Sequence, residues 1–463
     1  MNKTLNSKIV LILSVLLLFL VLGSVCAADN TDKISNETVL TSTQTGVDTV
    51  TTVDQVSAAE ATDSNGSDTG NQVLGASDNS ILSDGEKTFN DLKNEVEADS
   101  TVTLSGYYLY SDGQSSAINV TGKIINGNGA TIDTNNVVNI HPFICSGNVT
   151  LKNINFINLK QTTQLTNFQG GPVVFASGSS NITFDDCTFS SLTTTVATTA
   201  GAIGIPNGNN VTIKNCKFHD NNYYNSLIIM YPNLSENVLV ENCEFYSNTA
   251  SNSNGDLFFN NVNNVTVRNC NFTNENPKHR IVYIGSGSQR LVENCVFYNN
   301  TIATSGMEIA GSNATVKNCN FTNNTVVQGV LRSTASYTNI TECNFINTTS
   351  KGTANTHPSS IFVSGGYSTL NNCNITNSKS TTNYDYNGAV YWSGSYGMIY
   401  NVHFTDCHSD STKGDGGAIS ITSAYNTVSD CTFNHCTAGN VGVINIGTQY
   451  NNVTSCVFND CSS

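Results

Sequence analysis

One nine-residue pattern returns through most of this chain and limits the folds open to it. It reads Asn-Val-Thr-Ile-Lys-Asn-Cys-Lys-Phe at 210–218 and Asn-Val-Thr-Val-Arg-Asn-Cys-Asn-Phe at 264–272. A repeat of this period indicates stacked supersecondary units, each too small to bury a core alone. With the last apolar residue of the pattern as the anchor, the chain holds twelve copies, spaced by 24 to 33 residues: Phe156, Phe189, Phe218, Phe245, Phe272, Phe297, Phe321, Phe345, Ile375, Phe404, Phe433 and Phe458.

Each repeat contains three short runs in which apolar residues alternate with others. The third run is Cys-x-Phe, as at Cys243 and Phe245, and the second resembles Val211 and Ile213. The first run begins with a small residue, as in Gly-Ala-Val-Tyr-Trp at 388–392. Alternation with a period of two indicates strands with one buried face. Three such strands per repeat predict an all-β fold: a right-handed parallel β-helix, a pectate-lyase-like solenoid of about twelve regular coils.

Two segments precede this solenoid. Residues 1–27 are predicted to be a signal peptide, because Lys3 and Lys8 precede a short apolar run and small residues follow it at 25–27. Residues 28–85 contain no aromatic residue and are rich in Ser, Thr and Asp, which predicts a disordered spacer. No later segment is apolar for long enough to span a membrane. We therefore expect an extracellular, cell-surface or cell-envelope protein without a membrane span after cleavage of the signal.

The β-helix is predicted to fill residues 86–463 and to begin with a capping helix. Phe89, Leu92 and Val96 have the spacing of one helix face, and Thr88 is a suitable N-cap. A solenoid needs a cap at its first coil, because an open strand edge invites pairing with other chains.

The charge balance argues against a nucleic-acid partner. The net charge is −15, with only 19 Lys and Arg residues and 11% charged residues in all. An acidic chain without basic clusters does not attract phosphate polymers. The Asn-x-Ser/Thr sequons, among them Asn119, Asn148 and Asn264, make the chain a candidate glycoprotein.

The cysteines follow the repeat and are predicted to be free. Side chains stacked on parallel strands lie about 4.8 Å apart, whereas a disulfide brings its Cβ atoms to about 3.5–4.5 Å. A linear stack also offers no tetrahedral metal site, so we expect buried thiols and no metal. Ten cysteines lie two residues before the anchor and three lie three residues after it: Cys187, Cys216, Cys243, Cys270, Cys295, Cys319, Cys343, Cys373, Cys431 and Cys456, then Cys407, Cys436 and Cys461.

The sequence contains no recognisable catalytic motif. Lysis of a uronate polymer needs a base such as Arg near bound Ca²⁺, and hydrolysis needs two or three convergent carboxylates. The chain has four Arg residues and scattered carboxylates. Glu308 and Arg332 fall on neighbouring coils and are predicted to form an ion pair on the outer face. We expect no catalytic residue and no cofactor.

The first strand also predicts a binding face. Alignment of the coils by their buried pairs gives one outward column, rich in large apolar residues: Val174, Gly204, Ile228, Phe258, Tyr283, Glu308, Arg332, Phe362, Tyr391, Ser420 and Asn445. Exposed apolar stripes mark interaction surfaces, and aromatic faces suit sugar rings. Phe258, Tyr283, Phe362 and Tyr391 are the predicted binding residues. The long connections near 157–172, 346–360 and 376–389 either wall a groove at this stripe or cover it.

The repeats resemble the adhesin-like surface proteins of methanogenic archaea. The resemblance rests on the stretch from Val292 to Asn300, on Asn-Gly-Asn-Gly-Ala-Thr-Ile-Asp at 126–133, and on strand starts such as Gly-Gly-Ala-Ile at 416–419. The last of these is also similar to the repeats of chlamydial polymorphic outer-membrane proteins. The resemblance implies a non-catalytic adhesin that binds glycans or surface proteins of neighbouring cells. The alternatives are a structural component of the cell envelope and a lyase or hydrolase acting on an acidic polysaccharide.

Overall fold

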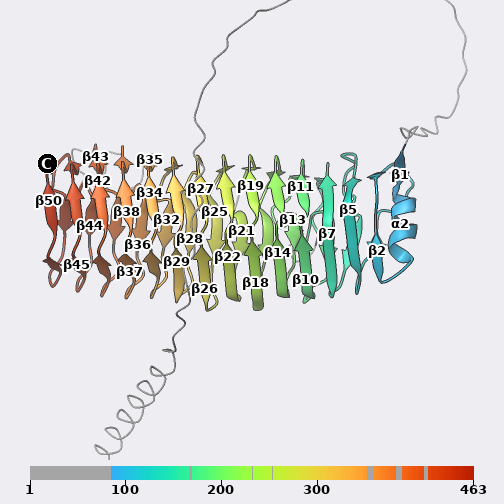
Figure 1. The fold of residues 1–463 in the computed structure, drawn as a ribbon, viewed down its shortest axis with the longest axis horizontal. Helices are drawn as coiled ribbons and strands as arrows, with labels where there is room; N and C mark the ends of the chain where they lie inside the picture. Colours follow the sequence, from blue (N-terminus) through green and yellow to red (C-terminus); the bar gives the residue numbers. More distant parts are fainter. Residues whose placement is uncertain are drawn as a thin grey trace, which may run out of the picture. The chain divides into compact units, whose positions relative to one another are not determined.

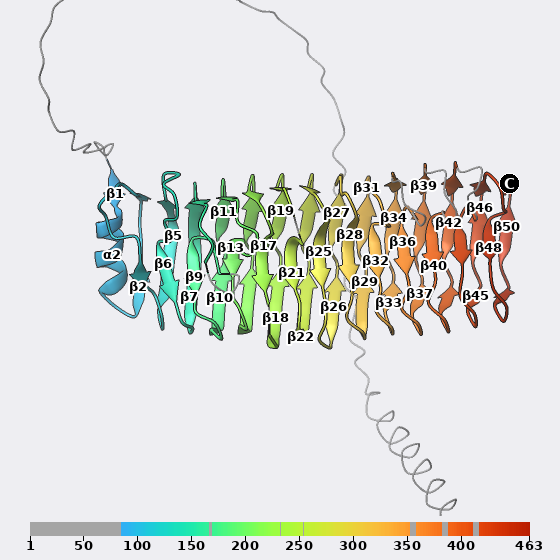
Figure 2. The ribbon, with the colours of Figure 1, turned by 180° about the vertical axis from the view of Figure 1, so that it is seen from behind.

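The computed structural model describes residues 85–165, 169–231, 233–252, 254–351, 358–381, 388–410 and 416–463. All of them belong to the unit Ser77–Ser463. The predicted signal peptide, and the predicted spacer apart from Gly85, lie outside the described residues. The described chain is a stack of parallel coils, with α2 (Phe89–Glu97) at one end and β50 (Val457–Asn459) at the other (Figures 1 and 2). This architecture confirms the predicted all-β solenoid.

The first strands of the coils form one 13-stranded sheet, in which each strand pairs with those of the preceding and following coils. Its strands are β4 (Ile118–Asn119), β6 (Phe143–Cys145), β9 (Val173–Phe175), β13 (Ala200–Gly204), β17 (Ser226–Met230), β21 (Gly255–Phe259), β25 (Arg280–Ile284), β28 (Ser305–Ile309), β32 (Leu331–Ser333), β36 (Ile361–Val363), β40 (Val390–Trp392), β44 (Ile419–Ile421) and β48 (Ile444–Ile446).

The second and third strands of each coil belong to a 27-stranded sheet and meet at a sharp bend. Before the bend lie β2 (Thr101–Thr103), β10 (Ser180–Asp185), β14 (Asn209–Lys214), β18 (Ser235–Glu241), β22 (Val262–Arg268), β26 (Arg290–Glu293), β29 (Ala314–Lys317), β33 (Asn339–Thr341), β37 (Thr369–Asn371), β41 (Met398–Tyr400), β45 (Thr427–Ser429) and β49 (Asn452–Thr454). After it lie β1 (Glu86–Thr88), β3 (Tyr107–Leu109), β11 (Thr188–Ser190), β15 (Lys217–His219), β19 (Glu244–Tyr246), β23 (Asn271–Thr273), β27 (Val296–Tyr298), β30 (Asn320–Thr322), β34 (Asn344–Ile346), β38 (Asn374–Thr376), β42 (His403–Thr405), β46 (Thr432–Asn434) and β50. Two longer strands, β5 (Ile124–Asp133) and β7 (Val149–Ile157), run through the bend.

Two five-stranded sheets of very short strands lie on the connections between the third and first strands. One contains β8 (Lys160–Gln161), β12 (Thr193–Thr194), β16 (Asn222–Tyr223), β20 (Thr249–Ala250) and β24 (Asn276–Pro277). The other contains β31 (Thr325–Val326), β35 (Thr349–Ser350), β39 (Lys379–Ser380), β43 (His408–Ser409) and β47 (Thr437–Ala438).

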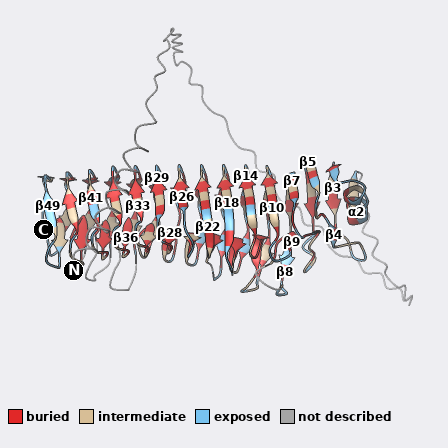
Figure 3. Ribbon diagram, turned by 90° about the horizontal axis from the view of Figure 1, so that it is seen from below, coloured by how far each residue is buried: buried red, intermediate tan, exposed pale blue. Residues whose placement is uncertain are grey.

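Equivalent residues of successive coils stack along the axis and fill the core, as the buried positions along the stack show (Figure 3). Phe245 pairs with Phe272, and their ring centroids are 4.8 Å apart. Cys270 and Phe272 are fully buried, which confirms the predicted inward register of the third strand. The rings stack from Phe156 to Phe345 and again from Phe404 to Phe458, and Ile375 joins the two stacks into one apolar column.

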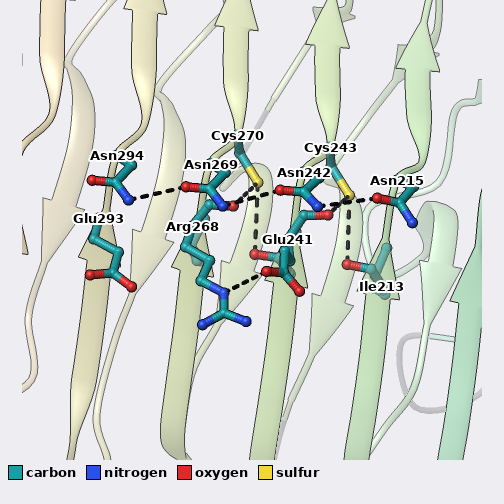
Figure 4. Close-up of polar contacts among 12 residues, drawn as sticks. Ile213, Asn215, Glu241, Asn242, Cys243, Arg268, Asn269, Cys270, Glu293 and Asn294 are labelled. Carbon is teal, nitrogen blue, oxygen red and sulfur yellow. Dashed lines mark hydrogen bonds and ion pairs between the residues drawn. The ribbon is translucent and has the colours of Figure 1, made fainter. Parts of the chain in front are cut away.

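Stacked asparagines make the bend between the second and third strands. Asn242 and Asn269 adopt φ of 54°, a left-handed conformation that Asn tolerates better than other non-glycine residues. The side-chain amide of Asn269 donates to Oδ1 of Asn242 at 3.1 Å, and Asn294 donates to Asn269 at 3.1 Å (Figure 4). Asp186 occupies this position in its own coil with φ of 56°, so its place there is that of a bend residue.

The N-terminal helix has the predicted cap. Thr88 accepts a hydrogen bond from the backbone of Asp91, whose side chain accepts one from Thr88 N in return. Phe89, Leu92 and Val96 are fully buried against the first coil. No helix in the described part of the chain has the length and apolarity needed to cross a membrane.

All fourteen described cysteines are free, in agreement with the ladder geometry, and twelve of them are buried. The thiol of Cys270 donates to the backbone oxygen of Arg268 at 3.2 Å, and the thiol of Cys243 donates to that of Glu241 at 3.3 Å. Burial raises the pKa of Cys187 and Cys216 well above the usual value. These thiols act as small apolar side chains with a weak donor.

Candidate functional site

The predicted outward column of the first strands exists, with one residue corrected. Phe258 pairs with Tyr283, and Phe362 pairs with Tyr391. The rings of the first pair stack at 5.0 Å, and those of the second pair lie 5.2 Å apart. The position assigned to Ile228 belongs to Ile229, which pairs with Phe258. Alternation could not decide between them, because Leu-Ile-Ile-Met at 227–230 is uniformly apolar.

The predicted apolar stripe is largely buried and not exposed. Phe258 and Tyr391 are each only 8% exposed, whereas Tyr283 and Phe362 keep more of their surface. Phe258 packs with Ala200 and Ile229 in a small apolar cluster, and Tyr283 packs against that cluster. Among the large residues of the column, partial exposure is thus found at Tyr283, Arg332 and Phe362, on either side of the buried Glu308. The long connections beside it are described only in part.

Two arginines and one glutamate meet at this part of the column. Arg332 Nη1 lies 2.6 Å from Glu308 Oε1, and Arg280 Nε lies 3.2 Å from Glu308 Oε2. The Arg280 guanidinium sits over the Tyr283 ring at 4.6 Å, and the Arg332 guanidinium sits over the Phe362 ring at 5.1 Å. We call these five residues the cationic–aromatic cluster. The predicted ion pair between Glu308 and Arg332 is thus part of a larger arrangement.

The cluster has a surplus positive charge. Two guanidinium groups face one carboxylate, which Arg280 contacts through Nε and Arg332 through Nη1. Burial raises the pKa of Tyr283, so its hydroxyl stays protonated. Burial and the neighbouring Arg280 lower the pKa of His279, so its ring is neutral at pH 7 and the charge resides on the arginines.

Such a cluster is suited to an anion carried on a flat, partly apolar molecule. Guanidinium groups bind carboxylates through paired N–H donors, and aromatic rings beside them contact apolar faces. The carboxylate that contacts the arginines, Glu308, is held by both of them. Among the described residues, no group of three or more His, Cys, Asp or Glu side chains could hold a metal ion.

Sequence reasoning missed Arg280 as a member of the site. Arg280 lies three residues before Tyr283 at the start of β25, outside the aligned column. Its long side chain reaches Glu308 on the next coil, a contact that an alignment of Cβ positions does not reveal. The available signal was the concentration of all four arginines of the sequence between residues 268 and 332, within two coils of Glu308.

A concave area lies on the outer face of the second strands, but its arginine is already paired. It is a groove of about 400 Å³, lined by Asn210, Thr212, Asn237, Leu239, Thr266 and Arg268 among others. Arg268 Nε donates to Glu241 at 2.8 Å (Figure 4). This pair leaves no surplus charge for a ligand, so the groove is a weaker candidate than the cationic–aromatic cluster.

Solved structures with similar folds include enzymes and an adhesin. The A-module of a mannuronan C-5 epimerase from Azotobacter vinelandii gives a TM-score of 0.40 at 10% identity, over 80% of this chain and 93% of that one. PfbA, a surface adhesin of Streptococcus pneumoniae, gives 0.30 at 13%, over 77% and 86%. Endopolygalacturonase I from Stereum purpureum gives 0.30 at 16%, over 74% and 99%. At such identities and scores these likenesses favour neither binding nor catalysis.

Sequence comparison supplies the family. No curated protein matches the chain. The profile of the family described as "Right handed beta helix region" matches residues 124–272 and 231–365, which together span more than half of the 463 residues. These matches cover the coils whose strands, bends and ladders are described above, and the chain therefore belongs to the right-handed β-helix family.

Proposed function

We propose that this protein is a cell-surface adhesin that binds an acidic glycan and does not cleave it. The observation that carries the proposal is the cationic–aromatic cluster, in which Arg280 and Arg332 share Glu308 between the rings of Tyr283 and Phe362. A uronate unit supplies both partners that the cluster lacks: a carboxylate for the guanidinium donors and an apolar sugar face for a ring.

The local charge of the cluster, and not that of the whole protein, supports this choice of ligand. The protein as a whole is strongly acidic, with a net charge of −15, and would repel a polyanion. A local surplus of positive charge on such a surface restricts the attraction to one place. The rings hold the arginine side chains by cation–π contacts, so that they lose less freedom on binding.

The arrangement favours binding over catalysis. Hydrolysis of a glycosidic bond needs one carboxyl group as acid and another as base or nucleophile. The cluster contains a single carboxylate, Glu308, which is held by two guanidinium groups. The predicted signal peptide supports export, and glycans of neighbouring cells are the partners that the proposal implies.

The proposal is tested with the full chain on immobilised polygalacturonate. We expect retention by the wild-type protein that weakens with salt, because the contact is ionic. Arg280→Gln with Arg332→Gln should lower the affinity by about tenfold or more, since charged hydrogen bonds contribute about 1.5–3 kcal/mol each. Arg268→Gln, which removes a paired arginine from another face, is the matched control and should bind normally.

Two results would contradict the proposal. Equal retention of the double arginine variant would exclude the cluster as the binding site. Steady release of unsaturated or reducing sugars from the polymer, with or without Ca²⁺, would show that the protein is a lyase or hydrolase.

A further inference from the structure

Five tyrosines form a second aromatic surface, in the turns that follow the first strands of the last five coils. They lie eight residues before the anchor in the last five coils, in the turn that leads into the second strand. Successive ring centroids are 5.1, 4.9, 5.0 and 5.1 Å apart, with the planes within 11° of parallel. We call this set the tyrosine ladder: Tyr337, Tyr367, Tyr396, Tyr425 and Tyr450.

The ladder is exposed although it is regular. The rings are 49% to 70% accessible, in contrast to the buried phenylalanine column of the core. Because each inner ring is covered on both faces by its neighbours, the accessible part is the outer edge, which carries the hydroxyl group. The molecule thus presents a row of phenol edges with a repeat of about 5 Å.

The backbone at these positions does not favour tyrosine. All five tyrosines have φ between 57° and 63°, the left-handed region that Asn and Gly tolerate and bulky residues avoid. The early coils have Asn at the same position, where Asn237 donates to Asn210 at 2.9 Å and Asn264 donates to Asn237 at 2.8 Å. Asn therefore satisfies the backbone at this position better than Tyr does. Unfavourable backbone conformations that persist tend to occur at functional sites.

The ladder lies in uncharged segments of the chain. The five segments that carry it contain no Asp, Glu, Lys, Arg or His: residues 334–341, 364–371, 393–400, 422–429 and 447–454. Their outward neighbours are Asn339, Thr369, Met398, Thr427 and Asn452, which pair in register. The equivalent face of the early coils carries Lys214, Glu241 and Arg268.

From these observations we infer that the tyrosine ladder and its outward neighbours bind an uncharged, extended glycan laid along the solenoid axis. Phenol edges, Thr hydroxyls and Asn amides offer donors and acceptors for sugar hydroxyls, and the ring edges and Met398 offer apolar contact. A row with a constant repeat suits a ligand that is itself a repeat. A charged polymer would gain no ion pair here and would lose hydration.

A second copy of the chain fits this face less well. Stable protein interfaces of standard size have an apolar core and bury about 800 Å² on each partner. Here the apolar edges form a single narrow row bordered by Thr, Ser and Asn. The face lacks the breadth of apolar surface that a dimer interface needs.

The experiment measures retention of the full chain by an unbranched uncharged glucan and an uncharged mannan in affinity electrophoresis. We expect at least one of them to retain the wild-type protein. The affinity for the retaining glycan should fall by about tenfold for each ring removed in a triple variant. The triple variant carries Tyr367→Asn, Tyr396→Asn and Tyr425→Asn. Asn is already the residue of the early coils, so the variant should keep the circular dichroism and thermal midpoint of the wild type. Tyr246→Asn with Tyr298→Asn is the matched control on the third-strand face.

The single variants Tyr396→Phe and Tyr396→Asn distinguish the contribution of the hydroxyl group to binding from that of the ring. They remain informative if the triple variant fails to fold. A loss of affinity with either of them supports the inference. Arg280→Gln with Arg332→Gln should leave uncharged glycans bound, which separates this site from that of the proposed function. The inference is overturned if neither polymer retains the wild type, if every ladder variant binds unchanged, or if sedimentation shows that the ladder only mediates self-association.

Discussion

At the scale of single residues, two carboxyl groups, those of Asp256 and Glu275, lie buried in a largely apolar interior. Glu275 occupies a position where neighbouring coils place Asn248 and Asn300, and like them it is buried. Its Oε1 accepts from Asn248 Nδ2 at 2.9 Å, while Asp256 accepts from the Tyr223 hydroxyl. The remaining oxygens, Asp256 Oδ2 and Glu275 Oε2, have no other partner, and the two carboxyls adjoin. A shared proton satisfies both.

This pair makes stability depend on pH. Burial raises the pKa of Asp256 to about 7 and that of Glu275 well above its usual range, where the charge of Asp256 adds to the effect. Between about pH 4 and pH 7 the folded state binds more protons than the unfolded state, so the free energy of unfolding falls as the pH rises. We expect a loss of about 1–3 kcal/mol from pH 5 to pH 8 in urea unfolding. Glu275→Asn should flatten this dependence, whereas the exposed control Glu236→Gln should not. An equally steep slope in Glu275→Asn would contradict the assignment.

At the scale of the strand, charges alternate along one column of the second strands. Lys214 pairs with Asp185 and Glu241, and Arg268 pairs with Glu241 and Glu293. The amine of Lys214 is 3.4 Å from Asp185, and Arg268 Nε is 2.8 Å from Glu241. Each charge thus lies between two of opposite sign, as Figure 4 shows for Glu241, Arg268 and Glu293. A strand that paired with the next coil but one would meet a like charge. The alternating column therefore favours pairing between adjacent coils.

Reversing one charge in this column should be destabilising. Arg268→Glu places three acidic side chains in a row, and each like-charge pair costs about 0.2–1 kcal/mol. Arg268→Gln removes the attraction without adding repulsion and should have a smaller effect. The measurement is urea unfolding at low and high salt, where screening should reduce the difference between the variants. A salt-independent loss would indicate a packing defect instead.

At the scale of the whole molecule, each coil is supported only by its neighbours and the first coil by α2. Leu92 is fully buried beneath this helix, whereas Asn94 is exposed. Leu92→Ala should cost about 2–5 kcal/mol locally. Because stability in a solenoid propagates between adjacent repeats, faster hydrogen exchange should appear in β2 and β3 and not in β45 or β46. Asn94→Ala should leave both regions unchanged. A uniform increase along the chain would show one cooperative unit instead.

The sequence predicts the repeating parts of this fold better than its exceptions. Phe272 and Cys270 face the core as predicted. Alternation with a period of two determines the buried face of each strand, and twelve repeats show the same pattern. Ile229 was missed where four apolar residues follow one another. The cluster at Arg280 and the pair of Asp256 with Glu275 depend on side-chain reach and on connections of variable length, which no column alignment captures. Whether Phe258 and Tyr391 are covered depends on the same connections.

The direction of the backbone hydrogen bonds has a mechanical consequence. Because strands pair only between successive coils, these bonds run along the axis of the stack. Tension that peels the chain from one end therefore meets the bonds of one coil at a time. A coil of about 25 residues adds roughly 4.8 Å to the folded stack but releases about 80–90 Å of extended chain when it detaches. Under shear, the molecule would lengthen in small steps and dissipate work at each one, while the coils that remain keep their surfaces intact.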